Sequence, residues 1–276
     1  MEKMSLRAAS RVSIRSTGLM FGTGVLMQSA RAHAWLGARG VCAYDRQWWL
    51  RTWARMMLLS SATRVSVVGS IARSSRPRLI VANHRTPLDI PLLMSLFGGR
   101  VLSKSDVASL PVVGSAATWA ETIYVDRNDR TSGASAIREI RKALKAGGTV
   151  SVFPEGTTHA GDEVRPFRSG AFAALRALDV EIIPVGIAYD PGVEFVNETF
   201  SAHLSRIAQR ASTSVCVRVG SELTGCAPTG CGSSNSISQA AQLAVQELVF
   251  SARQDWHRAT PHASSFMLNG ERARRL

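Results

Sequence analysis

The sequence has few cysteines, no long uninterrupted hydrophobic run and few acidic residues. Its four cysteines have neither paired C-x-x-C spacing nor a matching histidine pattern, which argues against a zinc site: Cys42, Cys216, Cys226 and Cys231. Cys226 and Cys231 are close enough for a loop disulfide. No segment resembling a cleavable signal peptide is recognisable, however, so we expect reduced thiols in a cytosolic compartment. No stretch approaches the ~20 apolar residues that a membrane-spanning helix needs.

The shortage of acidic residues leaves a strong positive charge. Thirty-three Lys and Arg against 20 Asp and Glu give a net charge of +13. The excess lies at both ends: residues 1–60 carry nine basic side chains and two acidic ones, and residues 253–276 add five arginines. Such a field attracts nucleic acid, an anionic membrane surface or a phosphorylated substrate. The alternative is a basic surface without a dedicated ligand.

Hydrophobic patterning predicts an alternation of strands and helices. Predicted strands span residues 64–69, 78–82, 123–125, 149–153, 181–187 and 215–219. Predicted helices span residues 47–60, 88–97, 132–146, 170–178 and 238–251. This order predicts an α/β fold, in which a mostly parallel central sheet is flanked by helices, with an N-terminal amphipathic helical segment.

We divide the chain at two changes in composition. Residues 1–62 form a basic N-terminal arm with an amphipathic membrane-surface helix, residues 63–252 the α/β domain, and residues 253–276 a basic C-terminal tail. The first 40 residues have weak periodicity, which predicts a poorly ordered or loosely helical arm.

Tryptophans and arginines interleave in the segment before the first predicted strand. Trp48, Trp49 and Trp53 alternate with arginines at positions 46, 51 and 55. Indole rings at headgroup depth beside guanidinium groups are typical of a helix that lies on a membrane surface. A core-packing helix with a solvated basic face is the alternative.

The first chemical motif is residues 83–89, N-H-R-T-P-L-D, directly after a predicted buried strand. A turn into the next helix brings Asp89 back to His84. A carboxylate on one imidazole nitrogen fixes the tautomer and leaves the other nitrogen free to accept a proton. Alternatively, His84 is an ordinary turn residue and Asp89 only favours the helix N-terminus.

Two further motifs follow predicted strands. In the first, residues 124–127, Arg127 is suited to bind a phosphate, and a surface Asp-Arg pair is the alternative. In the second, residues 153–158, Gly156 allows close backbone approach, and Thr157 offers a hydroxyl and an amide to an anion. Glu155 would repel a phosphate, so we expect it to orient neighbouring amides or an arginine. A plain turn is the alternative for this second segment.

The order of these motifs resembles the lysophospholipid acyltransferase family, which includes 1-acylglycerol-3-phosphate and glycerol-3-phosphate acyltransferases. H-x4-D, strand-Asp-Arg, F-P-E-G-T and the I-I-P-V-G of residues 182–186 occur in the family's order. The K-S-D of residues 104–106, followed by L-P-V-V-G at 110–114, is similar to the family's lysine-led segment. The match covers about residues 67–223, and it implies the glycerolipid acyltransferase fold.

The resemblance also implies an activity and roles for single residues. His84 would take the proton of an acceptor hydroxyl as general base, with Asp89 orienting its ring. The fatty acyl group would pass from acyl-CoA or acyl-carrier protein to a lysophospholipid, first of all 1-acylglycerol-3-phosphate to give phosphatidate. No acyl-enzyme is expected, in agreement with the lack of a G-x-S-x-G elbow, and no metal or cofactor is implied. The substrate-binding residues would be Arg127, Glu155, Gly156, Thr157, Lys104 and Arg168, with residues 182–186 lining the site or the acyl groove.

Departures from the family pattern leave the acceptor open. Thr86 replaces a frequent serine, Asp106 a frequent glutamate and Arg168 a frequent lysine. Thr158 stands where many members have arginine or serine. The missing cation at Thr158 makes a lyso-ornithine lipid the second candidate acceptor.

Two other functions compete with acyl transfer. One is a charge-driven membrane- or nucleic-acid-binding protein, although the sequence has no nucleic-acid recognition motif and we expect no such partner. The other is a thioesterase that uses the His-Asp pair on water. Because lysolipids reside in bilayers, we expect a peripheral (monotopic) protein on the cytoplasmic face of an anionic membrane.

Overall fold

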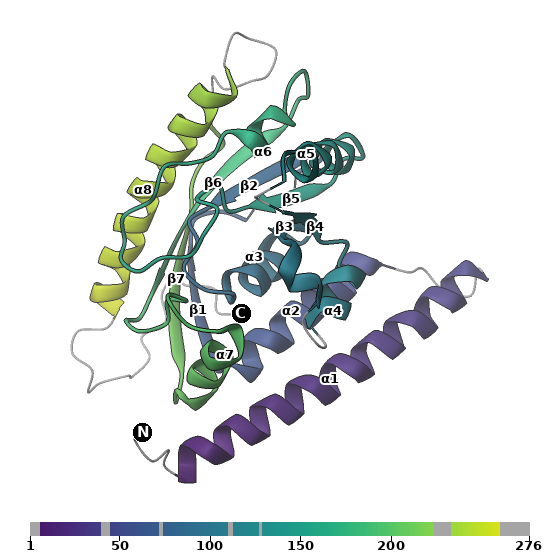
Figure 1. Ribbon diagram of the computed structural model, residues 1–276, viewed down its shortest axis with the longest axis vertical. Coiled ribbons are helices and arrows are strands. Elements are labelled where there is room, and N and C mark those ends of the chain that lie inside the picture. Colours follow the sequence, from purple (N-terminus) through teal and green to yellow (C-terminus); the bar gives the residue numbers. More distant parts are fainter. Residues whose placement is uncertain are drawn as a thin grey trace.

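A seven-stranded sheet forms the centre of the computed structural model, which describes residues 6–39, 45–71, 74–109, 113–126, 129–223 and 233–259 (Figure 1). The strands are β1 (Thr63–Val68), β2 (Arg78–Ala82), β3 (Arg100–Lys104), β4 (Ile123–Val125), β5 (Thr149–Val152), β6 (Glu181–Tyr189) and β7 (Thr213–Val219). Their order is β1-β7-β6-β2-β5-β3-β4, and every neighbouring pair is parallel except β6 with β7. The predicted mostly parallel sheet is therefore confirmed.

Helices cover both faces of the sheet. They are α1 (Leu6–Ala38), α2 (Arg46–Ser60), α3 (Asp89–Phe97), α4 (Val113–Trp119), α5 (Arg130–Lys145), α6 (Gly170–Ala173), α7 (Phe200–Gln209) and α8 (Ser234–Ala259), with a 3-10 turn at Ser105–Ser109. In Figure 1, α5, α6 and α8 lie on one side of the sheet, and α2, α3 and α4 lie on the other. This is the expected α/β layering, with the sheet buried between helices.

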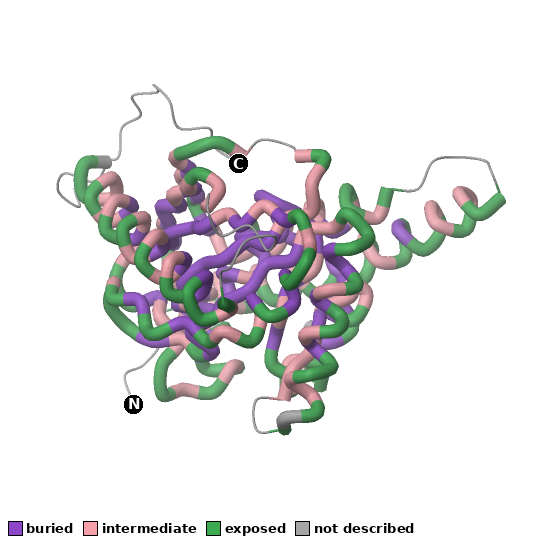
Figure 2. Tube along the Cα trace, turned by 90° about the horizontal axis from the view of Figure 1, so that it is seen from above, coloured by how far each residue is buried: buried purple, intermediate pink, exposed green. Residues whose placement is uncertain are grey.

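Two hydrophobic cores result, one on each face of the sheet. Strand β2 contributes to both: Leu79 and Val81 face the core with α5 and α8, whereas Ile80 and Ala82 face the core with α2 and α3. All four are fully buried, as Figure 2 shows for the central segments in purple. Because successive side chains of a strand point to opposite faces, β2 is fixed from both sides, and so is the turn that follows it.

Helix α1 differs from the poorly ordered or loosely helical arm that the sequence predicts. It is a continuous helix of 33 residues that packs against α2 and α7. Its Arg15 donates hydrogen bonds to the carbonyl oxygens of Ala208, Arg210 and Ala211 at the end of α7. Those carbonyls have no intrahelical partner, and a cation favours a helix C-terminus. The weak periodicity arises because α1 buries only Thr23 and Ala30.

The predicted membrane surface is wrong at Trp53. Its side chain is buried in the core, and its indole nitrogen donates to the Thr23 hydroxyl of α1 over 3.3 Å. Trp53 is therefore a contact between α1 and α2 and does not face a membrane. Among the helices of the described ranges, none has the length and apolar character that crossing a bilayer requires.

Besides α1, five elements differ from the sequence prediction. Strand β3 and helices α4 and α7 fall where no element is predicted, and α6 is shorter than the expected helix at 170–178. Helix α8 runs past residue 251 because Arg253 pairs with Asp162, and Trp256 packs against the small core around Ala188. The cysteine pair Cys226 and Cys231 lies outside the described residues, whereas Cys216 is buried with a free thiol.

Candidate active site

The turn that carries His84 is anchored at the carboxyl end of β2. Asn83, fully buried, donates to the carbonyl oxygen of Ile187 over 2.9 Å and accepts from the Ile187 amide over 2.8 Å. This two-way amide bond fastens the end of β2 to β6. The chain must then turn away from the sheet, which places His84 at the sheet edge where ligands gather in α/β folds.

His84 and Asp89 form a hydrogen-bonded pair. The Nδ1 atom of His84 lies 2.8 Å from Oδ2 of Asp89, whose side chain is fully buried. The same oxygen accepts the backbone amides of Arg85 over 2.7 Å and Thr86 over 3.0 Å. Asp89 is the first residue of α3, where the helix dipole also favours its negative charge.

This arrangement fixes the tautomer of His84. An ionised carboxylate only accepts, so Nδ1 carries the hydrogen and Nε2 is the acceptor. The imidazole stacks on the Phe153 ring at 4.2 Å and 16°, which holds its plane. The side chain is 15% exposed, and within the described ranges Nε2 has no partner. The pair can therefore take a proton from a hydroxyl group that reaches the sheet edge.

Glu155 supports the same turn from the end of β5. One carboxylate oxygen accepts the backbone amide of His84 over 2.7 Å, and the other accepts the Arg165 amide over 2.9 Å. The first oxygen also pairs with the Arg85 guanidinium at 3.1 Å, and His159 lies 3.2 Å from the second. The side chain is fully buried, and its contacts are with two backbone amides, the Arg85 guanidinium and His159.

Arg85 joins the loop after Glu155 to the turn that carries His84. Its guanidinium donates to the carbonyl oxygens of Gly161 over 2.7 Å and Glu163 over 2.9 Å. His159 also bonds to the Glu163 carbonyl, and burial lowers the pKa of its imidazole below the usual value. Arg85 and His159 therefore hold the loop of residues 156–165 against the turn that carries His84.

Gly156 and Arg168, two of the predicted substrate-binding residues, lie together. Gly156 has a φ of +76°, and a Cβ there would lie 2.9 Å from the guanidinium Nε of Arg168. A side chain would be strained in this backbone conformation and would collide with the arginine. Arg168 is therefore an exposed cation beside Gly156, at the carboxyl end of β5.

The other predicted substrate-binding residues are less closely assembled. Thr157 is exposed beside Gly156, while the half-buried Thr158 donates its hydroxyl to the Phe195 carbonyl over 2.6 Å. Lys104 ends β3 and is ion-paired with Asp106, which lowers the pKa of that carboxyl. Arg127 lies outside the described residues.

Residues 182–186 do not match the groove-lining role that the resemblance implies. They lie within β6, where Ile182 and Val185 belong to the two cores. A Cβ on Gly186 would lie 2.4 Å from the Leu248 backbone. The small residue is therefore needed for close packing of α8 on the sheet.

Two buried residues that the motifs do not identify also contact the turn. Tyr189 ends β6 beside Asp89, and burial together with that carboxylate raises the pKa of the phenol well above its usual value. His203 of α7 lies 2.9 Å from the Thr86 hydroxyl. Both are distant in sequence from the motif. A single Tyr or His within an apolar segment is the one sequence feature that points to them, and it does not indicate a role.

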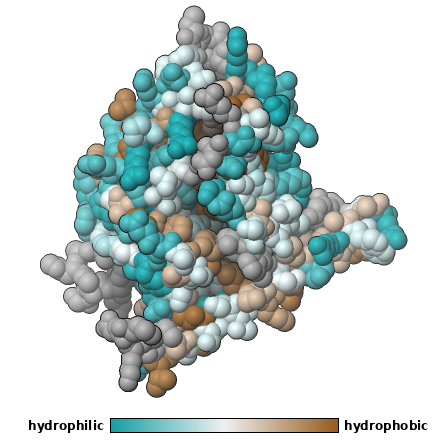
Figure 3. Space-filling model, viewed as in Figure 1, coloured by the Kyte–Doolittle hydropathy of each residue, from teal (hydrophilic) through white to brown (hydrophobic). Residues whose placement is uncertain are grey.

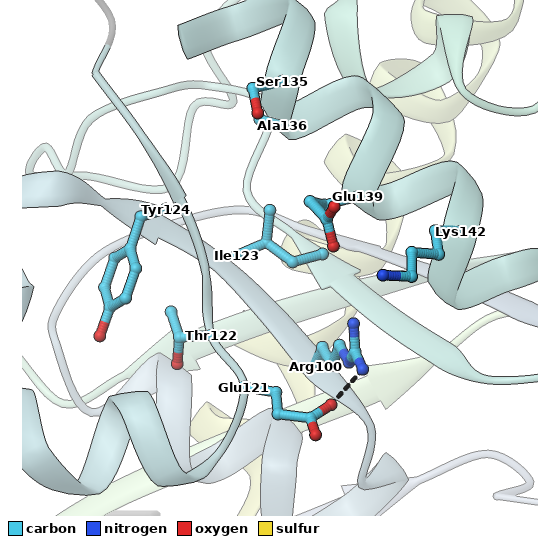
Figure 4. A pocket seen from close by; sticks show the side chains of 9 residues that line it. All are labelled: Arg100, Glu121, Thr122, Ile123, Tyr124, Ser135, Ala136, Glu139 and Lys142. Atoms are coloured by element: carbon cyan, nitrogen blue, oxygen red, sulfur yellow. Dashed lines mark hydrogen bonds and ion pairs between the residues drawn. The ribbon is translucent and has the colours of Figure 1, made fainter.

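A cavity of about 340 Å³ lies elsewhere, between β4 and α5 (Figure 4). Its Arg100 is ion-paired with Glu121, and Glu139 and Lys142 of α5 face the same space. Burial alone would raise the pKa of Glu121, but Arg46 and Arg100 lower it below the usual value. Arg100 begins β3 and pairs with Val150, so this cavity is nearer the amino ends of the strands and contains none of the predicted site residues.

Known proteins identify the family. The acyltransferase family model matches residues 64–188. A lyso-ornithine lipid O-acyltransferase of Pseudomonas aeruginosa is 31% identical over 183 residues, 63% of this chain and 69% of that protein. The chain belongs to the acyltransferase family.

The names of further relatives give two different acceptors. A lyso-ornithine lipid O-acyltransferase of Rhizobium meliloti is 31% identical over 65% of this chain, and the chain spans 59% of that protein's length. A chloroplastic 1-acyl-sn-glycerol-3-phosphate acyltransferase of Brassica napus is 29% identical over 45% of this chain and 36% of that protein.

A solved structure has the same fold. The 1-acyl-sn-glycerophosphate acyltransferase PlsC of Thermotoga maritima superposes with a TM-score of 0.60 at 20% identity, covering 88% of this chain and 98% of that one. The glycerolipid acyltransferase fold that the motifs imply is thereby confirmed.

Proposed function

We propose that this chain is an O-acyltransferase that moves a fatty acyl group from a thioester donor to the free hydroxyl of a lysolipid. The observation that carries the proposal is the His84–Asp89 pair, with Nε2 free at the sheet edge, in a chain of the acyltransferase family. The donor is acyl-CoA or acyl-carrier protein, because a thioester supplies the activated carbonyl.

The residues of the turn support a mechanism without an acyl-enzyme. Nε2 of His84 takes the hydroxyl proton as the acceptor oxygen attacks the thioester carbonyl, and Asp89 stabilises the imidazolium that forms. The tetrahedral intermediate then collapses, the C–S bond breaks, and the proton passes from Nε2 to the departing thiolate. The acyl group thus moves from sulfur to oxygen and the proton from oxygen to sulfur, and the products are the acylated lipid and a free thiol.

The lyso-ornithine lipid is our preferred acceptor, in place of the 1-acylglycerol-3-phosphate favoured by the motifs alone. Two relatives with matching names support it. Many family members have arginine at the position of Thr158. Threonine carries no charge, and the Thr158 hydroxyl already donates to the Phe195 carbonyl, so this position supplies no cation for a phosphate. The exposed guanidinium of Arg168 is suited to bind the carboxylate of an ornithine headgroup in a bidentate pair. The Brassica napus relative supports 1-acylglycerol-3-phosphate as the second candidate.

A competition between acceptors tests this choice. With a mixture of lyso-ornithine lipid and 1-acylglycerol-3-phosphate and one acyl-CoA donor, we expect acylated ornithine lipid as the main product by mass spectrometry. The experiment is repeated with acyl-carrier protein to identify the donor. Phosphatidate as the main product would contradict the preferred acceptor and support the second candidate.

A membrane surface is the expected partner of α1 and α2. Trp48, Arg55 and Leu59 recur at helical spacing on the exposed face of α2, with Trp48 54% and Leu59 71% exposed. Helix α1 exposes further large apolar side chains, among them Ile14 and Phe21. Figure 3 shows hydrophobic residues in brown in the lower part of the molecule, where α1 and α2 lie. Apolar side chains beside arginines favour the surface of an anionic bilayer, on the cytoplasmic face where the thioester donors occur.

Replacing Trp48 and Leu59 with serine tests this membrane contact. We expect the double variant to bind vesicles containing phosphatidylglycerol at least about tenfold more weakly in a flotation assay, because two apolar anchors are lost. Leu243→Ser is the matched control, since Leu243 is 70% exposed on α8. Equal partitioning of the double variant and the wild-type chain would refute the contact.

A further inference from the structure

A segment beyond the family-matched region binds the catalytic turn and the loop beside it. The backbone amide of Phe195 donates to the Arg85 carbonyl over 2.8 Å, and the Phe195 carbonyl accepts the Thr158 hydroxyl. The Thr86 hydroxyl lies 2.9 Å from Nε2 of His203. The family match ends at residue 188, so motif residues are held by a segment that the motifs do not include.

His203 is held at both ring nitrogens. The imidazole is fully buried, and its Nδ1 lies 2.8 Å from a carboxylate oxygen of Glu198. Burial lowers the pKa of His203 below its usual value, although the Glu198 carboxylate opposes that shift. Arg206 binds Glu198 as well and lowers the pKa of that carboxyl, which keeps it ionised. A guanidinium nitrogen of Arg206 also lies 3.0 Å from Nδ1 of His203, so both ring nitrogens have partners, and the Thr86 hydroxyl, which can donate or accept, bonds Nε2.

Thr86 lies within the loop that closes Asp89 onto His84. Its backbone amide donates to Oδ2 of Asp89, and its carbonyl accepts the Asp89 amide over 3.0 Å. Its side chain is fully buried, so it is not a substrate contact. A hydroxyl fixed to α7 therefore restricts the backbone that sets the position of the Asp89 carboxylate.

We propose that His203 is a positioning residue for the His84–Asp89 pair, which it holds through the Thr86 hydroxyl. Glu198 holds the imidazole of His203 through Nδ1, as Asp89 holds that of His84. The turn thus has two histidine–carboxylate pairs in series: one facing the sheet edge for proton transfer, the other buried for alignment. The role in turnover rests on the proposed acyltransferase function.

Kinetics of Thr86 variants test the proposal. Thr86→Val keeps the side-chain shape but removes the hydroxyl, and we expect kcat to fall roughly ten- to a hundredfold with little change in KM, because small misplacements of reacting groups are costly. Thr86→Ser keeps the hydroxyl and should restore most of the wild-type kcat. His203→Asn should resemble Thr86→Val, and the double variant should be no slower than the slower single variant, because both remove one interaction. Equal kcat values for Thr86→Val and Thr86→Ser would overturn the proposal.

Amide hydrogen exchange gives a measurement that does not depend on turnover. We expect faster exchange at the Arg85 and Thr86 amides in Thr86→Val and His203→Asn, with unchanged protection in the central strands. A general loss of stability would instead raise exchange throughout the sheet. Unchanged protection of the two turn amides would overturn the positioning role, even if the chain transfers no acyl group. A wild-type chain without acyl transfer would refute the proposed function alone.

Discussion

His84→Ala is expected to lower kcat by about 10²–10⁴-fold while the protein stays folded, because a general base contributes about that factor. The imidazole is the group whose Nε2 is free and whose Nδ1 is held by Asp89 at 2.8 Å. Its ring stacks on Phe153. The measurement is release of free thiol from acyl-CoA in the presence of the lysolipid acceptor.

His257→Ala is the matched control for this variant. His257 is exposed on α8 and contacts only the ring of Trp256 among the interactions of the described residues, so its removal should leave kcat unchanged. Thermal unfolding of both variants should agree with that of the wild-type chain within a few degrees. A folded His84→Ala chain with kcat within tenfold of the wild-type value would contradict the base assignment.

Glu155→Gln is expected to have the largest effect on stability. The carboxylate is fully buried and accepts hydrogen bonds from two backbone amides and from the buried guanidinium of Arg85. Removing one partner of a buried ion pair leaves the other charge uncompensated, at a cost of about 3–5 kcal/mol in the free energy of unfolding. The variant should unfold about 10 °C below the wild-type chain, and its kcat should fall because the His84 amide loses its acceptor.

Glu163→Gln separates this effect from a general loss of negative charge. Glu163 is exposed, and the contacts that the structure gives it are made by its backbone carbonyl, which the substitution keeps. Its free energy of unfolding should change by less than about 0.5 kcal/mol. If Glu155→Gln unfolds at the same temperature as Glu163→Gln, then Glu155 does not support the turn.

The sequence predicts the elements with strong patterns and misses those that depend on tertiary contacts. The buried run at β2 and the amphipathic α5 are correctly predicted, because their hydrophobic periods are clear. Strand β3 is missed since it follows Gly98 and Gly99, which are typical of a loop, and only pairing with β4 and β5 makes it a strand. Helix α7 has signals in Thr199, whose hydroxyl caps its first turn, and in Phe200, Leu204 and Ile207 at helical spacing, but the sequence prediction places no element there.

In the site, too, local contacts are predictable from the sequence and contacts between distant segments are not. The His84–Asp89 contact spans five residues, and local turn geometry is enough to predict it. The bond between the His84 amide and Glu155 joins residues 71 apart, and that between Thr86 and His203 joins residues 117 apart. Such contacts depend on strand order, which motif spacing does not encode. The predicted membrane contact of Trp53 fails for a related reason, because its burial depends on α1 packing over α2.

Acceptor dependence of thiol release tests the central claim most directly. Wild-type chain is mixed with acyl-CoA, with and without lyso-ornithine lipid, and the free thiol and the acylated lipid are both quantified. Direct transfer by the His84–Asp89 pair predicts thiol release that requires the acceptor, with one acylated lipid formed for each thiol. Thiol released at the same rate without acceptor, together with free fatty acid, would contradict the account and identify a thioesterase.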